Sequence, residues 1–313
     1  MKWIKEKTSI DFLSPKPRWI AVGFAVVTML ISIVLLATRG LEYGIDFTGG
    51  ILIEVAYPEA ADVDRIRELM DEAGFDEVQV QGFGADTDVL LRLPPQPEGD
   101  ADSVRETLTE TLASDQPGVV VRRVEVVGPQ VGEDLREQGA TAMIFASGMI
   151  FIYVMFRFQW KFAVGALASL VHDVILVLGF FSLFRWQFDL TVLASVLAMI
   201  GYSLNDTVVV FDRVRENFSL LRGVTPEQVL NQSLNDTLSR TIMTGFTTLL
   251  VLGILYAVAG ETLRPFSLAL IIGVVIGTYS SIYIASATSL FLNVSAKDMV
   301  PAERDAKYVD DLP

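Results

Sequence analysis

Long apolar segments separated by short polar links make up most of the chain. A helix needs about 20 mostly apolar residues to cross a bilayer, and six segments come close to or exceed that length. They cover residues 19–38, 138–156, 162–184, 190–212, 241–260 and 265–292. The pattern therefore predicts a polytopic α-helical membrane protein with six transmembrane helices.

The region between the first two apolar segments, residues 39–137, has shorter periodicities. Alternating apolar positions predict strands, and apolar positions spaced three and four residues apart predict amphipathic helices. The expected strands are 51–57, 77–83, 88–93 and 119–128, and the expected helices are 62–73 and 101–112. This βαββαβ order is typical of a ferredoxin-like α+β domain.

The positions of lysine and arginine predict how the chain is oriented in the membrane. Basic residues gather on the cytoplasmic side of transmembrane helices. All seven lysines lie in links that alternate helices would place on one side, at residues 2, 5, 7, 16, 161, 297 and 307. We therefore expect residues 1–18, 296–313 and the amphipathic segment 213–240 in the cytoplasm, and residues 39–137 outside. The first segment is expected to be a retained anchor.

The charge of the chain is unevenly distributed. The net charge is −14, yet residues 39–138 alone hold 23 acidic residues and 8 arginines, with no lysine. We interpret this acidity as a solvated surface, with cation binding as the alternative. The chain has no cysteine and one histidine, which excludes thiolate nucleophiles and multi-histidine metal sites. Such an acidic chain is not expected to bind nucleic acid, and no enzymatic constellation or metal site is expected.

Charged side chains inside apolar segments are costly to bury, so each suggests a function. Asp206, beside Asn205, is expected about 9 Å inside the cytoplasmic membrane face, at 1.5 Å per residue from Asp212. Arg240 opens the fifth apolar segment at a similar depth, which predicts an Asp206–Arg240 pair. The alternatives are that these charges fix helix packing, or that Arg240 only follows the bias of basic residues toward the cytoplasm.

Other polar residues in the apolar segments are weaker candidates. His172 and Asp173 lie near the middle of the third segment, as an ion path or as a buried, satisfied network. Thr247 and Thr248 in the fifth segment are expected to bond helix carbonyls, or else to line a hydrated path. Because Asp173 and Asp206 are expected at different depths, a catalytic aspartate dyad is disfavoured.

Four motifs identify a family. They are GIDFTGG at 44–50, VGPQVG at 127–132, GYSLNDTVVVFDRVREN at 201–217 and RTIMTGFTTL at 240–249. Together with the layout of one helix, an outside domain and five helices, they resemble the SecD/SecF family of bacterial protein-export membrane proteins, within the RND superfamily. The layout corresponds to the SecF half of that family, since the chain carries no SecD half.

The resemblance implies a function and partners. Members pair as SecD with SecF in the cytoplasmic (inner) membrane and assist the SecYEG channel and the SecA ATPase in moving an unfolded polypeptide. The energy comes from the ion-motive force, with H⁺ or Na⁺ as coupling ion and no other cofactor. Asp206 and Arg240 match the family's functional positions. The remaining contacts would be with membrane lipid.

The glycine-rich motif GIDFTGG lies between the first apolar segment and the outside domain. Gly44, Asp46, Gly49 and Gly50 are expected to form a glycine-permitted turn that transmits motion between the first helix and the outside domain. The alternative function is an RND-type efflux transporter of small molecules or ions. Such a transporter should present a ligand pocket in a larger outside domain, which disfavours it here.

Overall fold

Six long helices and one small α+β domain make up the computed structural model, which describes residues 9–75, 78–95, 101–260 and 263–295. Each of the six helices is long and apolar enough to cross a membrane. They are α1 (Pro15–Arg39), α5 (Pro129–Arg157), α6 (Trp160–Phe184), α7 (Leu190–Leu220), α8 (Pro226–Val258) and the continuous run α9 (Arg264–Ser280), η2 (Ser281–Ala285) and α10 (Ser286–Phe291). The prediction of a polytopic helical membrane protein is confirmed.

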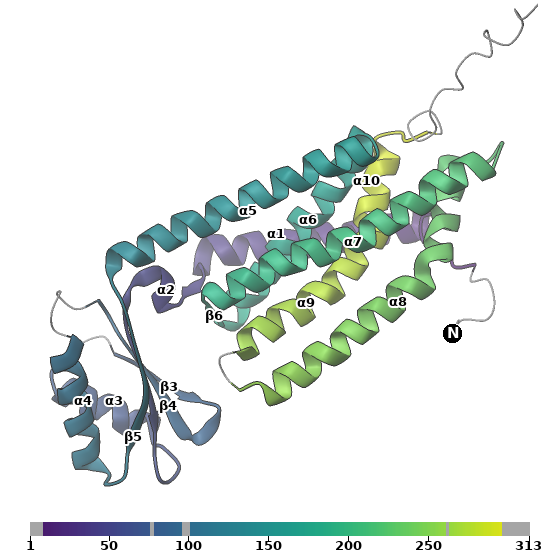
Figure 1. The fold of residues 1–313 in the computed structure, drawn as a ribbon. Coiled ribbons are helices and arrows are strands. Elements are labelled where there is room, and N and C mark those ends of the chain that lie inside the picture. The colour runs from purple at the N-terminus through teal and green to yellow at the C-terminus, as the bar shows by residue number, and fades with distance from the viewer. Residues whose placement is uncertain (1–8, 76–77, 96–100, 261–262, 296–313) are drawn as a thin grey trace, which may run out of the picture.

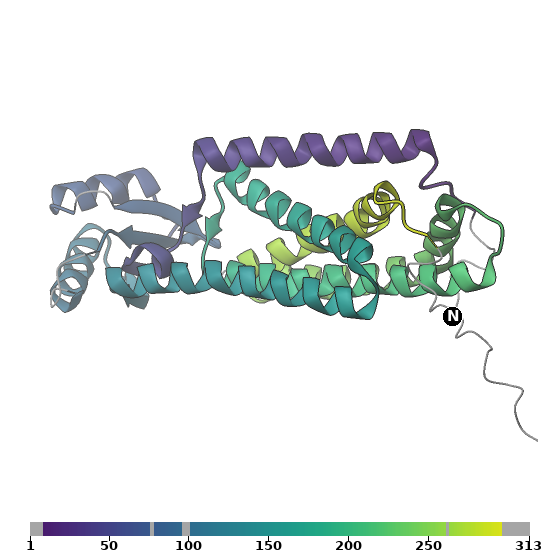
Figure 2. The same cartoon turned by 90° about the horizontal axis from the view of Figure 1, so that it is seen from above.

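The helices form an elongated bundle with the α+β domain at one end (Figure 1). α1 begins at the opposite end, and Figure 2 shows it along one side of the bundle. α6, α7 and α9 form the centre and bury many apolar side chains. At the end of the bundle away from the domain, the rings of Phe162 and Phe211 pack edge to face, with 4.8 Å between their centroids. A second apolar cluster nearer the domain includes Phe181, Val192 and Met199.

α7 and α8 extend beyond the apolar segments from which they were predicted. α7 continues to Leu220 and α8 begins at Pro226, so the segment 213–240 consists of the end of α7, a five-residue link and the start of α8. Thr225 and Gln228 form a reciprocal capping box that starts α8. Arg213 and Asp236 pair at 2.7 Å between the two extensions. The helix cap and the ion pair thus stabilise the helical ends of α7 and α8 beyond the apolar segments.

The small domain is an antiparallel four-stranded sheet with two helices on one face. Its elements are β2 (Gly50–Ala56), α3 (Val63–Glu72), β3 (Gln79–Phe83), β4 (Ala85–Leu93), α4 (Ala101–Asp115) and β5 (Val120–Val127). The strand order is β3-β4-β2-β5. This is the strand and helix sequence that the periodicities predicted, although Gly84 alone joins β3 to β4, in place of the longer expected turn. The expected start of β3 at residue 77 lies outside the described residues.

The core of the domain lies between the sheet and its two helices. Ile53 and Leu91 of the sheet and Met70 and Leu108 of the helices are fully or almost fully buried. α3 begins at a side-chain cap, because Asp62 accepts hydrogen bonds from the amides of Asp64 and Arg65. The opposite face of the sheet carries Leu90 and Arg92 and lies toward the helix bundle, where both residues line cavities shared with the α6–α7 turn.

Short elements join the domain to the bundle. β1 (Glu42–Tyr43) follows α1 and pairs in parallel with β6 (Gln187–Phe188), which lies between α6 and α7. The single helical turn α2 (Ile45–Thr48) connects β1 to β2. The end of α1, the α6–α7 turn and the first strand of the domain therefore meet at one junction.

Candidate functional site in the helix bundle

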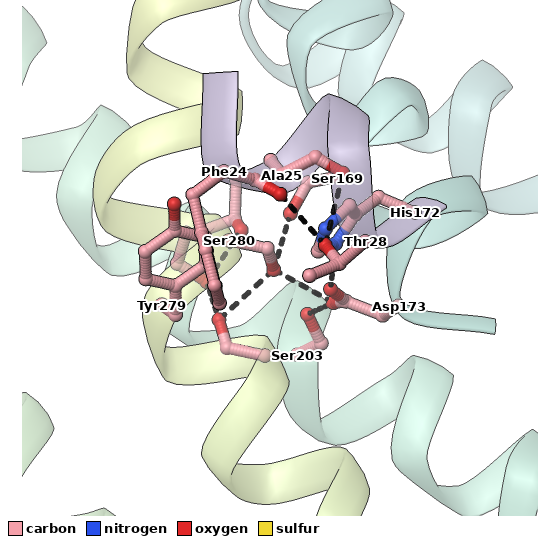
Figure 3. A network of polar contacts seen from close by, with 12 residues as sticks. Phe24, Ala25, Thr28, Ser169, His172, Asp173, Ser203, Tyr279 and Ser280 are labelled. Atoms are coloured by element: carbon pink, nitrogen blue, oxygen red, sulfur yellow. Dashed lines mark hydrogen bonds and ion pairs between the residues drawn. The ribbon is translucent and has the colours of Figure 1, made fainter. Parts of the chain in front are cut away.

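Asp173 of α6 is the centre of a buried polar network (Figure 3). Its side chain is 0% exposed. Its Oδ2 accepts hydrogen bonds from Ser203 Oγ of α7 at 2.7 Å and from Ser280 Oγ of α9 at 2.8 Å. Ser169 Oγ in turn donates to Ser280 Oγ at 2.8 Å. One carboxylate therefore ties together the three central helices, and hydrogen bonds of this kind satisfy a buried charge.

His172 extends this network toward α1. Its Nδ1 lies 3.1 Å from Asp173 Oδ1, and its ring lies 6.4 Å from the ring of Tyr279. The Tyr279 hydroxyl donates to the Ala21 carbonyl of α1 at 2.6 Å. Nε2 of His172 is buried and has no hydrogen-bond partner within the described part of the chain. The contacts therefore favour the interpretation of His172 and Asp173 as a buried polar network. Within that network, only the Nε2 atom of His172 lacks a described partner.

Close approach of α9 to α7 makes the network possible. A Cβ atom at Gly277 would lie 3.1 Å from Ser203 Cβ and 3.6 Å from Asp173 Oδ2. Directly after Ser280 the helix widens into the π-helical turn η2, and Ser281 in it contacts Thr207 of α7, Oγ to Oγ1, at 3.0 Å. Such π turns in helices are frequent at functional sites.

Asp206 of α7 is the second buried carboxylate, and it is 8% exposed. Its Oδ1 accepts a hydrogen bond from Thr241 Oγ1 of α8 at 2.7 Å. Its Oδ2 is buried without a partner among the residues that the structure describes. Because Ser203 and Asp206 are three residues apart on one helix face, the Asp173 network lies about one turn from Asp206.

The two acids therefore lie closer together along the bundle than the apolar segments predicted. Asp206 lies near the middle of α7, about 21 Å from its end at Leu220 for a rise of 1.5 Å per residue. The end of α7 lies beyond the apolar segment, so the depth of about 9 Å below the cytoplasmic membrane face stays a prediction. Asp173 is likewise near the middle of α6. The two acids nonetheless bond to different partners, so the contacts give no support to a catalytic dyad.

Arg240 does not contact Asp206 in this arrangement. It precedes Thr241 on α8, its side chain is exposed, and no ion pair forms between it and any described residue. Thr241 occupies the place next to the carboxylate, although Arg240 still acts on Asp206 electrostatically. Successive residues on a helix point about 100° apart, so Thr241 faces α7 and Arg240 faces outward.

The remaining polar candidates on α7 and α8 lie away from Asp206. Asn205 is exposed. Thr247 is exposed, and its hydroxyl donates to the carbonyls of Met243 and Thr244 at 2.9 and 3.1 Å, which is the carbonyl-bonding alternative. Thr248 is half-buried. Arg240 and Thr247 thus belong to a polar stripe on the open side of α8.

The sequence did not indicate which serine and threonine hydroxyl groups bond to the two buried carboxylates. Serine and threonine are common in transmembrane helices, where they bond carbonyls of their own helix. Ser203, Ser280 and Thr241 were therefore not singled out, although each contacts a buried carboxylate. Their only distinguishing feature is a helical spacing that places them opposite an acid on a neighbouring helix.

The GIDFTGG motif forms the junction between the bundle and the domain. Gly44 donates its amide hydrogen to the Phe188 carbonyl at 2.9 Å, and Asp46 Oδ2 accepts from the Leu190 amide at 2.9 Å. Gly49 and Gly50 have φ values of +71° and +126°, which disfavour residues with a side chain. A Cβ at Gly49 would lie 2.8 Å from Pro129 Cα, and one at Gly50 would collide with the Leu93 carbonyl oxygen.

Two carboxylates hold the first turn of α7 at this junction. Asp189 caps the helix by accepting from the Val192 amide at 2.8 Å, while Asp46 accepts from Leu190. Burial raises the pKa of Asp189, and the nearby Asp46 carboxylate adds to the rise, whereas hydrogen bonds from Thr191 and Val192 oppose it. The motif is therefore a tightly packed clamp on the helix that carries Asp206.

Comparison with known proteins assigns this architecture to a family. Six long apolar helices, a small α+β domain after the first and buried carboxylates in the bundle define a polytopic transport-type membrane protein. Residues 106–295 match the family model of the protein export membrane protein SecD/SecF, C-terminal, and residues 34–57 match that of the SecD/SecF GG motif. The chain belongs to the SecD/SecF family.

Individual relatives agree with this assignment. The protein translocase subunit SecF of Pseudomonas aeruginosa is 48% identical, over 93% of this chain and 95% of that protein. The subunit of the same name from Escherichia coli O157:H7 is 42% identical, over 93% and 90%. The crystal structure of SecDF from Thermus thermophilus, described as a translocon-associated membrane protein, matches with a TM-score of 0.83 and 34% identity over 94% of this chain. This chain spans 40% of the length of that SecDF chain.

Proposed function

We propose that this chain is an accessory subunit of the Sec protein-export machinery that uses the ion-motive force to promote late steps of translocation. The observation that carries the proposal is Asp206, a buried carboxylate with one oxygen bonded to α8 and the other without a described partner. An ion-coupled protein needs a buried group that can gain and lose a cation, and a desolvated carboxylate is such a group.

The coupling step would change how α7 and α8 are held together. When H⁺ or Na⁺ reaches Oδ2 of Asp206, its charge is neutralised and its attraction to Arg240 is lost. When the cation leaves, the carboxylate attracts Arg240 and strengthens its bond from Thr241. The two charge states thus favour different arrangements of the helices. A membrane potential supplies about 2.3 kcal/mol per charge per 100 mV for this step.

The junction clamp would transmit this change to the domain. α7 carries Asp206 in its middle and is held at its first turn by Asp46 and Asp189. Asp46 lies in α2, and only Phe47, Thr48 and Gly49 separate it from β2, which begins at Gly50. Because these glycines pack against backbone atoms, a displacement of α7 would move the domain and would not be absorbed by the junction. This is the motion-transmitting role that the sequence predicts for the motif.

We propose a SecD chain as the direct partner, with the SecYEG channel, the SecA ATPase and the unfolded polypeptide beyond it. The matched SecDF chain is more than twice as long as this one, which supports a second half of similar size. The polar stripe on α8, with Arg240 and Thr247 exposed, is the surface that such a half would cover. The exposed guanidinium of Arg240, which forms no ion pair with a described residue, would need a protein or water neighbour inside the membrane.

The proposed setting is the cytoplasmic (inner) membrane with both termini in the cytoplasm. The small domain, whose strand order fits a ferredoxin-like fold, would then lie outside. The lysine distribution supports this orientation. The relatives are translocase subunits, so the alternative of a small-molecule efflux transporter is not favoured.

The proposal is tested by Asp206→Asn in a bacterial strain whose growth depends on this chain. Asp212→Asn is a matched control, because Asp212 is on the same helix but is exposed and pairs with Arg157 at 2.5 Å. We expect Asp206→Asn to accumulate unexported precursor and slow growth while Asp212→Asn exports normally. Normal export with both variants at equal protein levels would refute the role of Asp206.

A further inference from the structure

A polar cavity of about 510 Å³ lies where the domain meets the ends of the helices. Gln81 of β3 and Arg92 of β4 line it from the open face of the sheet. Arg185, Trp186 and Gln187 line it from the α6–α7 turn, and Glu42 of β1, the partner of Arg185, also lies in its wall. The buried carboxylates of the bundle, Asp173 and Asp206, do not line this cavity.

Arg92 is the most unusual residue in the cavity wall. It is 8% exposed, its guanidinium donates to Gln187 Oε1, and its buried Nε has no partner among the described residues. None of the ion pairs between described residues includes it. Burial lowers the pKa of Arg92, while Glu42 and Asp189 act from a distance in the opposite direction. An arginine nonetheless stays charged in proteins, so a buried cation here faces the cavity without a bonded anion.

The second arginine marks where the cavity opens. Arg185 directly follows the last residue of α6 in a left-handed conformation with φ +57°, pairs with Glu42 at 2.5 Å and donates to the Arg39 carbonyl at 3.1 Å. Beside it, the Trp186 ring stacks on Phe184 at 4.7 Å. Tryptophan at the end of an apolar helix is typical of the membrane–water interface. The cavity therefore lies at the depth of lipid headgroups.

We propose that this cavity binds a phosphate group, supplied by the headgroup of a membrane phospholipid. Arg92 and Arg185 would contact the phosphate oxygens, because the planar guanidinium matches phosphate in shape and charge. Gln81 and Gln187 would add amide donors. The proposal is independent of ion coupling at Asp206.

Thermal unfolding of the full-length chain in a non-ionic detergent tests this site. The probes are short-chain phosphatidylglycerol, the matching diacylglycerol without phosphate, and inorganic phosphate. We expect phosphatidylglycerol to raise the midpoint of unfolding by several degrees at saturation, and neither of the other probes to do so. Ligands that bind only the folded state raise its stability in this way.

Variants connect the shift to the cavity. Arg92→Gln and Arg185→Gln should each raise the half-saturating concentration of phosphatidylglycerol at least tenfold. Arg185 is exposed, so its variant stays informative if Arg92→Gln fails to fold. Arg65→Gln is the control, because α3 lies on the other face of the sheet, and it should respond as the wild type.

Each other result has a defined meaning. An equal shift with diacylglycerol would overturn the proposal, because acyl chains alone would then explain the effect. An unchanged response in Arg185→Gln would also overturn it. A shift with inorganic phosphate that both cavity variants lose would support the phosphate site and assign it to a soluble anion in place of a lipid.

Discussion

Replacing each of the two buried carboxylates of the bundle with asparagine should affect the stability of the protein differently. Asp173→Asn and Asp206→Asn are chemically the same change at sites about one helical turn apart. Asp173 accepts two hydroxyl hydrogen bonds from two other helices through Oδ2. Asp206 accepts one, through Oδ1. We therefore expect Asp173→Asn to destabilise the protein and Asp206→Asn to leave its stability nearly unchanged.

The magnitudes follow from these contacts. A hydrogen bond to a charged group contributes about 1.5–3 kcal/mol in soluble proteins, whereas one between transmembrane helices averages about 0.6 kcal/mol. Ser280 also has an alternative acceptor, the Gly277 carbonyl at 3.1 Å, which limits its loss. We expect Asp173→Asn to lower the free energy of unfolding by about 1–3 kcal/mol. In Asp206→Asn the amide oxygen can keep the Thr241 bond, so the change should stay within about 1 kcal/mol.

Denaturant unfolding of the purified chain in mixed micelles measures both values. Ser195→Ala is a suitable control, because the buried Ser195 hydroxyl bonds only to the Val192 carbonyl of its own helix. Its unfolding free energy should change less than that of Asp173→Asn. Equal destabilisation by the two Asp→Asn changes would refute the distinction between a structural carboxylate and a functional one.

Three further changes test the domain and its junction. Gly50→Ala should abolish export and lower expression, measured by immunoblot, because its Cβ would collide with the Leu93 carbonyl. Leu108→Ala should lower the free energy of unfolding by about 2–5 kcal/mol, measured by denaturant titration, because Leu108 is fully buried. Tyr57→Phe should stabilise the domain slightly, because the buried Tyr57 hydroxyl has no partner among described residues. Burial raises the pKa of Tyr57 to about 12 from 10.0, so wild-type stability should fall between those pH values, and that fall should be absent in Tyr57→Phe.

Hydropathy predicted the six helices because span length and apolar content are local properties of the sequence. It failed at the helix ends, where α7 and α8 continue as polar helices. There the capping box at Thr225 and the Arg213–Asp236 pair sustain the structure. The βαββαβ element order was also predictable, because strand and helix periodicities differ.

The site was only partly predictable, because a sequence does not show which side chains meet across helices. Charge in an apolar segment singled out Asp206 and Asp173 correctly as buried residues. Their partners, among them Ser203 and Thr241, come from other helices and are ordinary residues in a membrane. Arg240 and Thr241 are neighbours in sequence, and only the rotation of α8 decides which one reaches the carboxylate.

If a cation at Asp206 drives export, translocation should depend on an imposed ion gradient, and membrane vesicles can measure that dependence. Inside-out membrane vesicles containing this chain with its SecD partner would hold a precursor arrested late in translocation. Imposing a proton gradient, or in a second arm a sodium gradient, should speed completion in the wild type and in Asp212→Asn. It should have no effect in Asp206→Asn, and the arm that responds identifies the coupling ion. Equal acceleration in Asp206→Asn and the wild type would contradict the claim.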